Sequence, residues 1–125
     1  MTPATAIAAL KRQLAAKGQT IRLQRTQSAA GVVTEAAGVD ARAFVRGYRP
    51  EELGTGIQQQ DSKIIMGAAE IIAANWTSGR ASPEDPRVPR KNNRVVVSGR
   101  SYNVEAAVGI YMGAELVRIE IQARG

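Results

Sequence analysis

Large apolar residues near the start of the chain recur at helical spacing. Three of them share one face, three or four residues apart: Ile7, Leu10 and Leu14. Thr2 is a good N-cap, Pro3 suits the first helical position and Gly18 suits the position after the last. The pattern therefore predicts a small amphipathic helix over residues 3–17. The stripe is too short for a stable free helix, so it must dock, either on the chain's own sheet or on a neighbouring subunit.

Elsewhere apolar and polar residues alternate, which is typical of half-buried strands. Residues 19–27 show this with Ile21 and Leu23 on one face. Residues 98–100 (Ser-Gly-Arg) separate two β-rich runs and indicate a hairpin. We expect about six strands in all: residues 19–27, 39–46, 62–66, 94–97, 101–108 and 115–124.

The segments between these runs are rich in Gly, Ala or Pro. Residues 28–38 indicate a flexible loop or a hairpin. Residues 68–75 predict a brief helix with Ile71 and Ile72 turned inward. Residues 76–93 contain three of the five prolines. An irregular segment this long in a small domain is either a functional loop or disordered when free.

These elements predict a mainly β fold, namely a small antiparallel β-barrel or sandwich with an N-terminal α-helix and long irregular loops. The length of 125 residues supports a single domain. Its expected parts follow in chain order: the N-terminal helix (1–18), the first strands with loop 28–38 and the short helix (19–75), the Pro-rich loop (76–93) and a C-terminal β-meander (94–125).

The composition points to a thin core. Hydrophobic residues make up 44% of the chain, but 21 of them are Ala and only 34 are large. A domain of this size is already marginal by surface-to-volume scaling. We therefore expect part of the stability to come from partner subunits.

Several kinds of chemistry are excluded by missing residue types. The chain has no His and no Cys, so it cannot build an imidazole base, a thiol nucleophile, a disulfide or a zinc site with those ligands. The run 54–56 lacks the Lys-Ser/Thr of a phosphate loop, and the acids show no metal-ligand spacing. We expect no enzyme activity, no cofactor and no metal. No apolar run reaches the roughly 20 residues of a membrane span, and residues 1–18 lack the pattern of a secretory signal.

The net charge of +6 is unevenly distributed. Residues 1–34 and residues 86–104 each carry five bases and no acid, whereas the remainder carries seven bases and eleven acids. One interpretation is two basic patches that face nucleic acid or acidic partner surfaces. The other is a solvated surface that keeps the protein soluble, and the scarcity of aromatic residues for base stacking supports it.

Two aromatic residues have alternative roles. For Trp76, the single Trp, the favoured role is a plug or lid over the core, and the alternative is an interface anchor at the root of the Pro-rich loop. Phe44 lies on the polar side of its strand, so either that strand is covered on both faces or Phe44 contacts a partner. The candidate interface anchors are therefore these two and the helix stripe: Ile7, Leu10, Leu14, Phe44 and Trp76.

Four stretches of the chain resemble a known family: 44–53 (FVRGYRPEEL), 56–66 (GIQQQDSKIIM), 89–104 (PRKNNRVVVSGRSYNV) and 115–124 (ELVRIEIQAR). They are similar to the head-closure (stopper) or head–tail connector proteins in the neck of long-tailed phages and of gene transfer agents. The resemblance covers roughly residues 40–125 and consists mainly of β-hairpin patterns.

The resemblance implies a virion structural protein, made in the host cytoplasm, that forms a homo-oligomeric ring of sixfold or twelvefold symmetry. The ring would join the portal or adaptor to the tail terminator or tail tube, and would close or line the exit channel of the packaged double-stranded DNA. Segments 76–93 and 28–38 would be its contact and gating elements. The basic residues expected to contact DNA or a partner lie in or beside the Pro-rich loop: Arg80, Arg87, Arg90 and Lys91.

Two other functions fit the same residues. One is a tail terminator or tail-completion subunit. The other is a free-standing basic nucleic-acid-binding β-barrel, which predicts strongly salt-dependent binding of short DNA by the isolated monomer.

Overall fold

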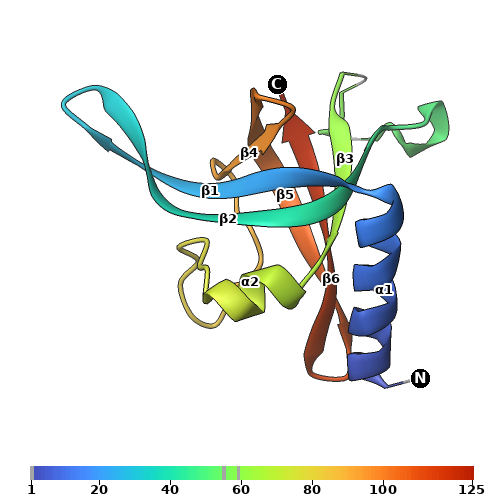
Figure 1. Ribbon diagram of the computed structural model, residues 1–125. Helices are drawn as coiled ribbons and strands as arrows, with labels where there is room; N and C mark the ends of the chain where they lie inside the picture. The colour runs from blue at the N-terminus through green and yellow to red at the C-terminus, as the bar shows by residue number, and fades with distance from the viewer. Residues whose placement is uncertain (1, 55, 59) are drawn as a thin grey trace.

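The computed structural model describes residues 2–54, 56–58 and 60–125. The middle of the Gly-rich run 54–56 therefore lies outside the described residues. Within these ranges the chain forms six strands, two α-helices and one 3-10 turn (Figure 1). In chain order they are α1 (Pro3–Lys17), β1 (Gln19–Ala29), β2 (Val32–Gly47), η1 (Pro50–Glu52), β3 (Ser62–Gly67), α2 (Ala69–Ala74), β4 (Arg94–Val97), β5 (Arg100–Met112) and β6 (Glu115–Arg124).

The strands form one antiparallel sheet that closes on itself. The strand order is β1-β2-β3-β6-β5-β4, and β4 pairs back with β1 to complete a closed barrel. This confirms the predicted fold class. The predicted alternation also holds in β1, where Ile21 and Leu23 are buried while Arg22 and Gln24 lie at the surface. Apolar side chains from all six strands fill the interior and are thereby removed from water.

Strands β1 and β2 continue beyond the barrel as a two-stranded ribbon. Strand β4 pairs with β1 only at residues 21–24, and β3 pairs with β2 only at residues 43–47. The rest of the hairpin projects to one side (Figure 1). It turns at Ala30 and Gly31, whose positive φ values of 52° and 78° are those of a tight two-residue turn. Residues 28–38 are thus the end of a hairpin, the second of the two expected alternatives.

Helix α1 docks on the chain's own sheet, against β2, β3 and β6. Leu14 is fully buried, while Ile7 and Leu10 are half-buried. The guanidinium of Arg42 holds the C-terminal end of the helix, because it donates hydrogen bonds to the Leu14 carbonyl (3.3 Å) and the Gly18 carbonyl (2.6 Å). A cation there also opposes the negative end of the helix dipole.

Gly18 follows the end of α1, where a glycine usually adopts a left-handed conformation, but here it serves a close backbone approach instead. Its φ is −83°, so it is extended and not left-handed, and its N–H donates to the Leu14 carbonyl at 2.8 Å. A Cβ at this position would lie 2.6 Å from the Leu14 oxygen and 2.8 Å from the Ala43 oxygen. Gly18 therefore permits a close approach between the helix end and β2.

We expect Gly18→Ala to lower the free energy of unfolding by about 1–3 kcal/mol, because the methyl group would push two backbone segments apart. Gly47→Ala is the matched control, since a Cβ there meets nothing within 4 Å. Urea unfolding followed by circular dichroism would measure both. Equal stability of the two variants would contradict the close-approach role.

Helix α2 and the Pro-rich segment cover one end of the barrel. Ile71 is buried, but Ile72 is 41% exposed, so the expectation that both point inward is wrong for Ile72. Adjacent residues of a helix are rotated by about 100°, and a helix this short buries one narrow face. Segment 76–93 contains no helix or strand within the described chain. It is held by a hydrogen bond that the Ser78 N–H donates to the Pro86 carbonyl (2.8 Å).

No helix in the described ranges is long and apolar enough to span a membrane.

Candidate functional site

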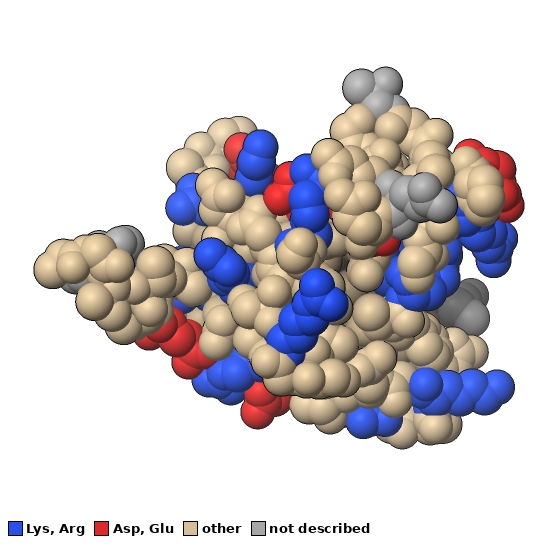
Figure 2. All heavy atoms as spheres, turned by 90° about the horizontal axis from the view of Figure 1, so that it is seen from above, with Lys and Arg blue, Asp and Glu red and all other residues tan. Residues whose placement is uncertain are grey.

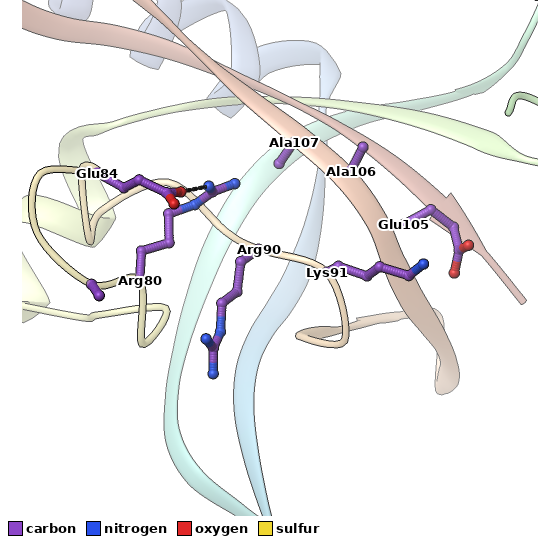
Figure 3. Close-up of a pocket in the computed structure, with 8 residues that line it drawn as sticks. Arg80, Glu84, Arg90, Lys91, Glu105, Ala106 and Ala107 are labelled. Carbon is purple, nitrogen blue, oxygen red and sulfur yellow. Dashed lines mark hydrogen bonds and ion pairs between the residues drawn. The ribbon is translucent and has the colours of Figure 1, made fainter. Parts of the chain in front are cut away.

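The main hollow beside the Pro-rich segment lies between that segment and strand β5 (Figure 3). We call it the loop groove. It has a volume of about 520 Å³ and is lined by Arg80, Ala81, Glu84, Arg90, Lys91, Glu105, Ala106 and Ala107. In the described residues no group of three or more acidic side chains is placed to hold a metal ion. The groove therefore offers binding chemistry through its charges and its backbone.

An unpaired stretch of strand forms one wall of the loop groove. Strand β4 pairs with β5 only at residues 100–103. The backbone of Val104 then bonds to Asn92 and Asn93, at 2.9 Å each. From Glu105 to Met112, no backbone hydrogen bond is made on that side within the described chain. We call residues 105–112 the β5 edge.

Arg80 organises the Pro-rich loop. Its Nε donates to the Val88 carbonyl (3.0 Å), its Nη2 donates to the Pro89 carbonyl (2.7 Å), and its Nη1 pairs with Glu84. These bonds tie two distant parts of the loop together and neutralise the guanidinium. The expected contact of Arg80 with DNA or a partner stays a prediction, for a side chain that these bonds hold within the loop.

Arg87 is neutralised in the same way. Its Nη2 lies 2.9 Å from Asp85 Oδ2, and the Tyr111 hydroxyl donates to the same carboxylate at 2.8 Å. The hydrogen bonds from Arg87 lower the pKa of Asp85 to about 2. The Asp85 carboxylate, shared by Arg87 and Tyr111, thus fastens the loop to β5. The expected contact of Arg87 with DNA or a partner stays a prediction.

Arg90 and Lys91 differ from Arg80 and Arg87 in having no acidic partner among the described residues. Both residues are exposed, and neither makes an ion pair within the described part of the chain. Figure 3 shows the two side chains leaving adjacent positions in different directions. Of the four basic residues expected at the site, these two keep an accessible charge.

We expect Arg80→Ala to lower the free energy of unfolding by about 1–3 kcal/mol, because several carbonyls lose their donor. The same change should make the loop more sensitive to proteolysis. Lys91→Ala should change stability by no more than about 0.5 kcal/mol, since it removes an exposed, unpaired charge. Limited proteolysis and urea unfolding of both variants test this difference, and equal behaviour would contradict the loop-holding role of Arg80.

The basic block of residues 1–34 is also partly neutralised, because Arg22 forms ion pairs with acidic residues outside it. The Arg22 guanidinium lies 2.7 Å from a Glu35 carboxylate oxygen and 3.0 Å from Asp40, across the hairpin. Acidic and basic side chains consequently interleave on the face shown in Figure 2. The outer part of the arm in that view is almost uncharged, because residues 26–34 contain no charged side chain. We call residues 26–34 the arm tip.

The large apolar side chains that remain exposed gather mainly in two places. The arm tip has Val32 (59% exposed) and Val33 (56%). The β5 edge has Val108 (56%) and Tyr111 (44%). Sequence reasoning did not select these four residues, although Val32 and Val33 stand out as a pair of Val residues in a Gly- and Ala-rich segment.

The residues expected as interface anchors lie mostly inside the chain. Leu14 and Trp76 are buried, and the Trp76 indole N–H donates to the Ala37 carbonyl at 3.1 Å. Trp76 therefore fills the core, as the favoured interpretation has it, and the anchor role of these two residues stays a prediction. Phe44 is half-buried and lines a hollow at the end of α1. Ile7 and Leu10, on α1 itself, are half-buried as well.

The fold and surface together define a small closed antiparallel barrel with a projecting, uncharged hairpin arm and an open strand edge. No protein-family model matches the chain, and no curated protein matches it.

Proposed function

We propose that this protein is a structural subunit of the head–tail interface (neck) of a tailed phage or gene transfer agent. It forms a ring that joins the portal or adaptor to the tail and surrounds the DNA exit channel. The observation that carries the proposal is the arm, which leaves the barrel and ends in the exposed Val32 and Val33. Exposed apolar side chains on a projecting arm are available for contact with another protein.

Two further features support a ring subunit. The resemblance of residues 44–66 and 89–124 to neck proteins implies a small β-barrel, and the chain has this fold. The arm tip and the β5 edge are two separate apolar surfaces, one on the β1–β2 hairpin and one on β5. Unlike surfaces on one chain suit the head-to-tail contacts that generate closed rings.

Exposed basic side chains without an acidic partner in the described residues fit a position near DNA or near acidic neighbouring proteins. Lys11, Arg12 and Lys17 are exposed on α1, and Arg90 and Lys91 are exposed at the loop groove. Charges of this kind would contact phosphates without reading sequence.

The rival function, a free-standing nucleic-acid-binding barrel, finds few exposed aromatic rings in the described residues, and the most exposed, Tyr111, has its hydroxyl bonded to Asp85. Binders of single strands stack bases on aromatic faces. Tyr102 has the Arg100 guanidinium over its ring, 5.3 Å from the centroid, and Trp76 is buried. We therefore prefer the neck function, with weak and non-specific DNA contact.

The test is co-sedimentation of the purified protein with portal–adaptor particles encoded beside it, compared with binding of short DNA over a salt series. The neck function predicts stoichiometric binding to the particles and weak DNA binding. The variant Arg90→Ala with Lys91→Ala should weaken DNA binding further while leaving the fold intact. Tight, strongly salt-dependent DNA binding with no particle binding would overturn the proposal in favour of the rival.

A further inference from the structure

We propose that the arm tip of one copy adds as an extra strand to the β5 edge of the next copy, in and beside the loop groove. The inference rests on the proposed ring function, because it names the contact between neighbouring subunits. It assigns a donor and an acceptor surface to the same chain.

The acceptor is a strand edge that has the Pro-rich loop beside it but, from residue 106 onward, lacks charges and proline of its own. Natural sheets protect exposed edges with charges, proline or a covering segment. Residues 106–112 (AAVGIYM) contain no charge and no proline. A second hollow of about 260 Å³ continues the loop groove along this edge past Val108 and Tyr111, and shares Arg80, Glu84 and Ala107 with it. An extended segment therefore has backbone partners along the edge, and beside it a hollow lined by both charged and apolar side chains.

The donor is the part of the arm that the chain leaves uncovered. Nearer the barrel, two backbone groups of β2 already have side-chain partners: the Arg42 N–H donates to Glu70 (3.0 Å), and the Ala37 carbonyl accepts from Trp76 (3.1 Å). Residues 32–36 have no such partner among the described residues on the edge away from β1. The side-chain partners of the β2 edge therefore end at Ala37, next to these uncovered residues.

A second copy is the occupant that fits both surfaces. Residues 26–34 and 106–112 are both uncharged, so neither of the two paired segments brings a charge of its own into the contact. Each exposes two large apolar side chains, which would cover one another. The arm runs away from its own barrel and clear of β5 (Figure 1), so it is presented to a neighbour. Because donor and acceptor differ, each copy inserts its arm into one neighbour and accepts the arm of another, the head-to-tail contact from which closed rings are built.

The test is disulfide trapping between copies, for which the chain is well suited because it has no Cys. We expect the double variant Val33→Cys, Val108→Cys to form a ladder of cross-linked oligomers under mild oxidation. The matched control pairs Val33→Cys with Ile72→Cys, since Ile72 is also exposed but lies on α2, away from the groove. Cross-linked product should be at least tenfold lower in the control.

A second variant separates assembly from folding. Val32→Asp with Val33→Asp places charges on the arm tip and should reduce the oligomer to monomer without changing the melting temperature, because both side chains are exposed. Ile72→Asp should leave the oligomer intact. If rings form, alone or on the adaptor, but the Val33–Val108 pair links no better than the control, this contact is overturned while the neck function stands. If the protein binds no adaptor and no pair cross-links, both proposals fail.

Discussion

Trp76→Ala is expected to lower the free energy of unfolding by about 3–5 kcal/mol, the range for removing a buried Trp side chain. The indole is 3% exposed and lies in the core cluster with strands from both halves of the barrel. Its N–H also holds the Ala37 carbonyl at the root of the arm. The substitution would therefore loosen the attachment of the arm as well as the core.

Trp76→Phe is the control, since it keeps an aromatic ring but loses the N–H donor. It should cost about 1–3 kcal/mol, the usual penalty for leaving a buried carbonyl without its partner. Because Trp76 is the single Trp, far-UV circular dichroism should follow the urea transition in place of fluorescence. A loss below about 1 kcal/mol in Trp76→Ala would show that the indole is not a core element.

Asp61→Ala is expected to lower the free energy of unfolding by about 2–4 kcal/mol, because several hydrogen bonds to a buried carboxylate are lost together. Asp61 is 1% exposed. It accepts hydrogen bonds from Arg124 Nε (2.8 Å), Gln122 Nε2 (2.8 Å) and the Gln58 N–H (3.0 Å). The cluster fastens the segment before β3 to the end of β6.

The same cluster makes stability depend on pH. Hydrogen bonds from Arg124 lower the pKa of Asp61 from 3.8 to about 2. A lowered pKa means that the carboxylate stabilises the fold above about pH 4, and that this contribution is lost as the pH falls from there to about 2. The stability difference between the natural chain and Asp61→Asn should therefore shrink over this window.

Asp40→Asn is the matched control, since Asp40 pairs with Arg22 at the surface with its side chain 66% exposed. It should change stability little at any pH. Thermal unfolding at several pH values between 2 and 7 gives both comparisons. A constant difference between the natural chain and Asp61→Asn across that range would contradict the assigned role of Asp61.

Strand positions were predictable because their signal is local. Alternation in residues 19–27, 39–46 and 115–124 reflects one buried face, and the structure pairs all three as strands of the barrel. The arm was harder to predict, because residues 28–38 have few large side chains and no buried face to mark them. Only the pairing register, with Ser28 opposite Val33, extends β1 and β2 so far.

Charge was the least predictable property, since it depends on which residues meet. Arg22 pairs with Glu35 because the hairpin register brings them together. Arg124 and Asp61 are far apart in sequence and meet at the β3–β6 end of the barrel. The pairing of Arg87 with Asp85 is local and could have been anticipated. The basic block was counted over residues 86–104, and Asp85 lies just before its first residue.

The function proposed for this chain depends on assembly, so electron microscopy of the purified protein, alone and mixed with its portal–adaptor particles, is the most direct measurement. The account predicts closed rings of uniform diameter stacked on the adaptor face, with the arm of each subunit lying on its neighbour. A monomer that forms no ring and leaves the adaptor bare would contradict it.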